Sequence, residues 1–175
     1  GCIMAASGKL YYRTAAGAWT PLAVGSGSTA GGGGTTSFDT DFSVKMSGAT
    51  TVANLTTTKI ATFDTIVIDS NSEWDAINLR WECADTGPYV HFVNLVWDPN
   101  ATGYRNVYLY VDGAAVLNRG ALNFGASLNA HVQITYKMNL TAGQYVEVYG
   151  RQNSGGNLDA IVGTPATEWQ VWRVI

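Results

Sequence analysis

Cysteine and histidine are the residues of this sequence best suited to chemistry, and two of them lie close together. The chain has two cysteines and two histidines, and Cys83 precedes His91 by eight residues in the stretch ECADTGPYVHFVNLVW. A thiol activated by an imidazole is a common nucleophile, and both groups bind zinc. The pair therefore poses three alternatives: a thiol–imidazole site, part of a metal site, or two residues of a core.

The sequence around Cys83 favours the core. Alternate residues of a strand share a face, so a strand over residues 77–83 forms one apolar row, consisting of Ile77, Leu79, Trp81 and Cys83. A reactive thiolate needs positive charge nearby, whereas the neighbours Glu82 and Asp85 are acidic. A zinc site needs three or four protein ligands, and the chain has only four Cys and His residues. We therefore expect free thiols, no catalytic residues, no metal and no cofactor.

Other catalytic motifs are absent from the sequence. It contains no GxSxG elbow, no HExxH, no phosphate-binding loop and no dinucleotide fingerprint. Several aspartates lie near expected strand ends, where Asp is usual in turns: Asp39, Asp41, Asp64, Asp69, Asp75 and Asp85. A calcium site assembled from several such loops is the alternative for them.

Length and charge set broad limits on the protein. The 175 residues suit one main domain with a short appendage. Only 13% of residues are charged, and the formal charge is −3 with no basic stripe, which excludes a nucleic-acid footprint. No apolar run approaches the roughly 20 residues that span a bilayer, so we expect no membrane insertion.

The pattern from residue 38 onward is that of β-strands throughout. Short runs rich in Val, Ile, Thr and aromatic residues end at Gly, Pro, Asn or Asp, and none has a sustained helical period. The expected strands lie within 42–48, 61–69, 77–83, 89–97, 106–113, 131–140, 145–151 and 168–175. Many short strands at even spacing predict an all-β sandwich or jelly roll.

A glycine-rich segment divides the chain. Residues 25–37, GSGSTAGGGGTTS, are expected to form a flexible linker between an N-terminal arm, 1–24, and a domain over 38–175. Within the arm, GKLYYRTAAGAWTPLAV predicts a hairpin, which is barely stable alone and needs another surface. We interpret Tyr11, Tyr12 and Trp19 as residues that attach the arm to a larger assembly; the alternative is a poorly ordered tail.

Segments from residue 38 to residue 175 resemble, in order, the elements of one known family. FSVKMSG is similar to that family's first strand, and RNVYLYVDGAAV to its strand ending in Asn-Gly or Asp-Gly. Further matches lie at aromatic, Asp, Cys, Gly and aliphatic positions: Phe63, Asp64, Trp74, Asp75, Trp81, Cys83, Gly87, Tyr89, Leu140, Gly143, Val146, Trp169 and Trp172. On these residues the chain resembles the globular head of complement C1q, in the jelly-roll superfamily shared with tumour necrosis factor.

The sequence departs from that family at a few positions. Gln144 replaces the usual Asp, and Gln170 and Val171 replace Ser-Gly. His91 stands where the family has a core Phe. Either Phe92 takes over the core position through a bulge or a change of register, or His91 is buried and hydrogen-bonded to a neighbour.

The resemblance implies a jelly-roll homotrimer, and a fold alone does not define function. We favour a non-enzymatic virion protein of a bacteriophage (fibre, spike or head decoration). Its arm would bind capsid or tail proteins, and its knob would meet a host surface glycan. The alternative is a carbohydrate-binding module or secreted lectin-like domain of a larger extracellular protein. A secreted signalling head is a third interpretation.

The loop WDPNATGYRN is the best candidate for ligand contact. It brings aromatic and short polar side chains to one connection between strands, where recognition residues commonly lie: Trp97, Asp98, Asn100, Tyr104 and Arg105. Aromatic faces with short polar groups suit sugar rings. The alternative is a polar hairpin with Trp97 in the core. A second polar loop is expected over 153–160.

Overall fold

The computed structural model describes residues 3–6, 9–13, 19–21, 38–122 and 127–174. The chain divides into two compact units, Gly1–Ser37 and Phe38–Ile175. The expected linker, 25–37, lies outside the described residues. Within the described residues there is no helix, and hence none that could cross a membrane.

The N-terminal unit contains a small antiparallel sheet. Its strands are β1 (Ile3–Ala6), β2 (Lys9–Arg13) and β3 (Trp19–Pro21), in the order β1-β2-β3. The predicted hairpin is confirmed, because Tyr12 lies opposite Thr20 and Arg13 opposite Trp19. The pairing of β1 with β2 was not predicted. It adds a third strand, which a stable sheet of this size needs.

Within its described residues, the second unit consists of β-strands joined by turns and loops, with no helix. They are β4 (Phe38–Met46), β5 (Thr50–Val52), β6 (Thr58–Lys59), β7 (Phe63–Asp69), β8 (Trp74–Asp75), β9 (Arg80–Glu82), β10 (Gly87–Trp97), β11 (Tyr104–Val111), β12 (Ala114–Leu122), β13 (Ala130–Leu140), β14 (Tyr145–Gln152), β15 (Leu158–Ile161) and β16 (Glu168–Val174). The prediction of an all-β fold is confirmed. Strands β5, β6, β8, β12 and β15 were not among those expected.

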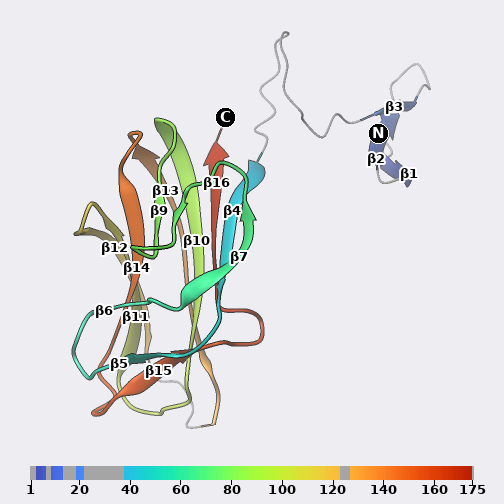
Figure 1. Ribbon diagram of the computed structural model, residues 1–175. Helices are drawn as coiled ribbons and strands as arrows, with labels where there is room; N and C mark the ends of the chain where they lie inside the picture. The colour runs from blue at the N-terminus through green and yellow to red at the C-terminus, as the bar shows by residue number, and fades with distance from the viewer. Residues whose placement is uncertain (1–2, 7–8, 14–18, 22–37, 123–126, 175) are drawn as a thin grey trace. The chain divides into compact units, whose positions relative to one another are not determined.

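Two antiparallel sheets pack against each other (Figure 1). The first sheet has the order β5-β15-β10-β16-β4-β7, with β13 also paired to β10. The second has the order β12-β11-β14-β9-β8, with β6 also paired to β14. Strands distant in sequence thus lie side by side, as β4 and β16 do, which gives a jelly-roll sandwich.

The core lies between the sheets and is rich in tryptophan. Trp81, Trp97 and Trp169 are at most 1% exposed. In β10 the row Tyr89, His91, Val93, Leu95 and Trp97 faces the core, as the alternation predicted. The end of β10 is buried on its other face as well, because Gly163 abuts Val96 and Asn94 donates a hydrogen bond to the Ala166 carbonyl.

The prediction of a strand over 77–83 is wrong in its first half. Residues 76–79 form a turn, and Ile77 is 92% exposed. The cause is Asp75, whose carboxylate accepts hydrogen bonds from the backbone N–H groups of Ile77 and Asn78 and from the Asn78 amide. Such side-chain bonds compete with a strand ladder. Of the predicted apolar row, only Trp81 lies on a strand, β9. Cys83 follows directly after β9 and is buried, as predicted.

Candidate functional site

The predicted contact loop lies at one end of the jelly roll, and Phe38, the first residue of this unit, lies at the other end. Val174, the last residue of β16, pairs with Phe38, and the neighbouring residue of β16 pairs with Tyr89 near the start of β10. Strand β10 then runs about 30 Å, at roughly 3.3 Å per residue, to Trp97. Loop 98–103 follows and is therefore distant from the end where the chain enters this unit.

Trp97 does not belong to the exposed part of that loop. Its side chain is 0% exposed, and its six-membered ring lies over Gly150, where a Cβ would come within 2.9 Å of the Trp97 ring. The prediction of Trp97 as a ligand contact is therefore corrected. The alternation that turns Leu95 inward also turns Trp97 inward, which is the alternative given above.

Arg105 is likewise buried and holds the loop from within. Its side chain is 0% exposed, and its guanidinium donates hydrogen bonds to the carbonyls of Asn100 at 2.7 Å, Thr102 at 2.6 Å and Gly103 at 3.1 Å. Burial lowers the pKa of Arg105 from its ordinary value. Arg105 therefore fixes the backbone of the loop and does not reach a ligand, which corrects its predicted role.

Asp98, Asn100 and Tyr104 remain partly exposed. Asn100 accepts a hydrogen bond from the Thr102 N–H at 2.8 Å, which closes the loop as an Asx turn. Burial and the charge of Asp159 raise the pKa of Asp98. These three residues keep the contact role as a prediction.

A second loop lies against the first. The backbone N–H of Tyr104 donates to the Asn153 amide oxygen, and the Asn153 N–H donates to the Tyr104 carbonyl at 3.3 Å. The expected exposed loop over 153–160 is shorter than predicted, because Leu158 begins β15 and is buried. Residues 98–103 and 153–157 thus form one joined rim at this end of the sandwich.

A row of tyrosines that was not predicted from the sequence begins at Tyr104. Alternate residues of β11 turn away from the core, and three of the four in this row are tyrosines: Tyr104, Asn106, Tyr108 and Tyr110. The signal was present in the alternation of YRNVYLYV. Strand β14 brings Tyr149 directly opposite Tyr108, which only the strand register determines.

Cys83 and His91 both lie in the core and do not form a site together. The Cys83 thiol donates to the Asp85 carbonyl at 3.0 Å, while Nδ1 of His91 accepts a hydrogen bond from the Trp169 indole at 3.3 Å. Burial raises the pKa of the thiol and lowers that of His91 to about 3. Among the described residues, no three His, Cys, Asp or Glu side chains gather as metal ligands would.

The structure also decides between the two alternatives for His91. His91 is 0% exposed and hydrogen-bonded, so it occupies the core position itself. Phe92 points to the other side of the first sheet, where its ring lies 6.3 Å from that of Trp172. No bulge exchanges the two residues.

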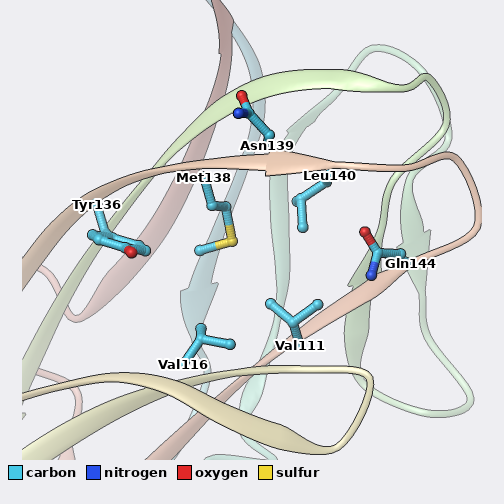
Figure 2. Close-up of a pocket in the computed structure, with 7 residues that line it drawn as sticks. All are labelled: Val111, Val116, Tyr136, Met138, Asn139, Leu140 and Gln144. Atoms are coloured by element: carbon cyan, nitrogen blue, oxygen red, sulfur yellow. The ribbon is translucent and has the colours of Figure 1, made fainter.

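A pocket of about 200 Å³ opens between β12 and β13 (Figure 2). Its walls are mostly apolar and include Val111, Val116, Tyr136 and Met138, with Gln144 at one end. Gln144 is held by Asp112, whose carboxylate accepts its amide N–H at 2.7 Å. No carboxylate, Cys or His is among the residues that line the pocket, and most of its lining is apolar.

Comparison with known proteins defines the fold. No protein-family model matches the sequence, and no curated protein matches it. Among solved structures, Eiger TNF from S. frugiperda matches with a TM-score of 0.57 at 12% identity, covering 79% of this chain and 93% of that chain. Murine APRIL matches with a TM-score of 0.57 at 12% identity, covering 75% and 96%.

The globular domain of zebrafish complement 1qA matches with a TM-score of 0.51 at 15% identity, covering 78% of this chain and 96% of that chain. Identities this low establish fold and nothing finer. The protein is therefore an all-β jelly roll of the type seen in TNF and C1q globular domains. This confirms the fold that the sequence resemblance implied.

Proposed function

We propose that the chain is a non-enzymatic structural protein on the surface of a virus particle, such as a phage fibre, spike or head decoration. Its jelly roll forms a homotrimeric knob that faces outward and binds a host surface or glycan. The observation that carries the proposal is the separation of the two ends of the sandwich. The chain enters at Phe38, while the rim of loops 98–103 and 153–157 lies about 30 Å away.

Two different apolar patches support a trimer. A cyclic trimer buries one patch of each subunit against a second, different patch of the next. The face patch consists of Val90, Phe92 and Trp172, half-buried on the side of the first sheet turned away from the core. The edge patch lines the pocket of Figure 2 and includes Val116, 45% exposed, and Tyr136, 38% exposed. We propose that these two patches meet between subunits.

The N-terminal unit supports the attachment role. It forms its own small sheet, and Tyr11, Tyr12 and Trp19 lie on β2 and β3. The sequence between this sheet and Phe38 includes the glycine-rich segment 25–37, which suits a tether. We propose that residues 1–24 bind capsid or tail proteins and leave the knob free to orient.

The mass of the protein in solution tests the trimer. Native mass spectrometry or light scattering should give three subunits. A clean monomer at micromolar concentration would overturn the trimeric knob and favour the alternative, a carbohydrate-binding module or lectin-like domain of an extracellular protein.

Deletion of residues 1–37 tests the attachment role. The shortened chain should remain folded and trimeric but fail to bind purified virus particles, whereas the full chain binds them. Undiminished binding by the shortened chain would show that the arm is not the anchor.

A further inference from the structure

The outward side of the second sheet carries a cluster of tyrosines, which we name the tyrosine face. It consists of Tyr104, Tyr108 and Tyr110 of β11 with Tyr145 and Tyr149 of β14. The intervening residues of both strands, such as Leu109 and Val148, are buried in the core. Because alternate residues point to opposite sides of a strand, the tyrosines point away from the core.

Three of the rings contact one another in series. The rings of Tyr110 and Tyr149 lie 4.2 Å apart with 34° between their planes, and those of Tyr108 and Tyr110 meet edge to face, 6.4 Å apart at 64°. Strands β11 and β14 hold them in fixed register, with Tyr108 opposite Tyr149. A surface built on paired strands is ordered before a ligand arrives, which reduces the entropic cost of binding.

Polar groups border the rings at fixed positions. The Asn106 amide donates to the Tyr108 hydroxyl at 3.3 Å, which leaves that hydroxyl its own proton to donate. Tyr149 donates to Glu147 at 3.2 Å. Asn118 lies opposite Tyr108 on β12 and is exposed. Aromatic faces with hydroxyl and amide groups at their edges match a ligand that has both C–H surfaces and hydroxyls.

The charges of the face are largely compensated. Lys59 pairs with Glu147 at 2.6 Å, and Arg80 pairs with Glu82 while its guanidinium lies 4.1 Å above the Tyr145 ring. Arg151, which lies opposite Asn106, adds a third positive charge beside those of Lys59 and Arg80. Single-stranded nucleic acids also stack on aromatic rings, but they need a positively charged groove, and this chain has a formal charge of −3. Charge complementarity therefore favours a neutral ligand.

We propose that the tyrosine face binds a neutral oligosaccharide, whose sugar rings stack on Tyr108 and Tyr110 and whose hydroxyls bond to Asn106 and Asn118. The negatively polarised face of a tyrosine ring attracts the C–H groups of a sugar ring. Tyr104, the first residue of β11, connects this row to the rim. A neutral oligosaccharide would thus be the ligand of the host-facing knob proposed above. The proposal depends on that function only in that the oligosaccharide would come from the host surface.

The experiment titrates the full chain with neutral hexasaccharides of glucose, galactose and mannose in α and β linkages. Calorimetry gives the affinity for each subunit, and NMR follows the tyrosine ring signals. At least one hexasaccharide should bind and shift the Tyr108 and Tyr110 signals. Tyr110→Ala should weaken that binding about tenfold or more, since residues at the centre of a contact carry most of its energy. Tyr110→Phe keeps the ring and should retain most of the affinity.

Ile66→Ala is the control, because it removes an exposed apolar side chain from β7 of the first sheet, outside the face patch and the edge patch, and should leave the affinity unchanged. Should Tyr110→Ala fail to fold, Asn118→Arg at an exposed position of the face replaces it and should also weaken binding. Soluble hexasaccharides bind one subunit at a time, so loss of the trimer does not affect this result.

Three outcomes overturn the proposal. The first is that no neutral hexasaccharide binds, or that only polygalacturonate or a single-stranded oligothymidine does. The second is that Tyr110→Ala binds as well as the unmodified protein. The third is that Tyr110→Ala changes the number of subunits, which would assign the face to a second copy of the chain.

Discussion

The indole N–H of Trp169 donates a hydrogen bond to Nδ1 of His91, 3.3 Å away in the core between the sheets. The imidazole also lies edge-on to Trp81, with ring centroids 5.1 Å apart. Within the described residues, Nε2 of His91 has no hydrogen-bond partner. The histidine is therefore accommodated only in its neutral form, because a charged imidazole in an aromatic core would lose its hydration without compensation.

This relationship predicts acid-dependent stability. Burial lowers the pKa of His91 to about 3, whereas the unfolded chain keeps the ordinary value near 6.5. The unfolded state therefore binds the proton first, and the contribution of neutral His91 is complete above pH 6.5 and lost as pH falls toward 3. The loss amounts to roughly 3 kcal/mol between pH 7 and pH 4. Urea melts across this range should show a shallower pH dependence for His91→Phe.

Thr135→Val, at an exposed position of β13 without a titratable group, is the control for this prediction and should keep the pH dependence of the unmodified protein. Equal pH slopes for His91→Phe and the unmodified protein would show that His91 does not govern acid stability.

Removal of the Arg105 guanidinium should loosen the rim. Arg105→Ala leaves the carbonyls of Asn100, Thr102 and Gly103 without their buried donor, at an expected cost of about 2–4 kcal/mol. Hydrogen exchange should increase in loop 98–103, and the melting temperature should fall. Arg119→Ala, at an exposed position of β12, should change neither. An unchanged loop in Arg105→Ala would contradict the scaffolding role.

A methyl group at Gly150 should disturb the packing of Trp97. The added Cβ would lie 2.9 Å from the Trp97 ring and 3.1 Å from Ile60 Cδ1, closer than such atoms normally approach. Gly150→Ala is therefore expected to destabilise the fold by about 1–3 kcal/mol in chemical denaturation. Gly156→Ala has no heavy atom within 4 Å of its Cβ and serves as the control. Equal stability of the two variants would refute this account of the core.

A charge on the face patch should separate the subunits of the proposed trimer. Phe92→Glu places a carboxylate beside Trp172 on the side of the first sheet turned away from the core, so the monomer should remain folded. Native mass spectrometry should then show single subunits, while the control Asn157→Glu, at an exposed position of the rim, should stay trimeric. Trimers of Phe92→Glu would show that the subunits meet elsewhere.

Local sequence patterns failed where a side chain bonds to backbone groups a few residues away and so overrides the apolar alternation. The strand expected over 77–83 loses its first residues to the Asp75 turn, a competition that apolar alternation does not register. Arg105 looked like a ligand contact because a loop arginine is usually exposed. Its burial depends on the three carbonyls that the loop turns inward, and strand alternation places it in the same inward row as Val107.

The sequence by itself determined the class of fold, the inward row of β10 and the core position of Cys83. These follow from the alternation of inward and outward residues along single strands, which involves only residues close together in the chain. The sequence also contained the outward row of β11. Tertiary structure alone decided that Tyr149 lies beside Tyr108 and Tyr110, that Trp169 bonds to His91, and that the rim lies opposite to Phe38. Each of these depends on the register between strands that are far apart in the chain, which no local pattern encodes.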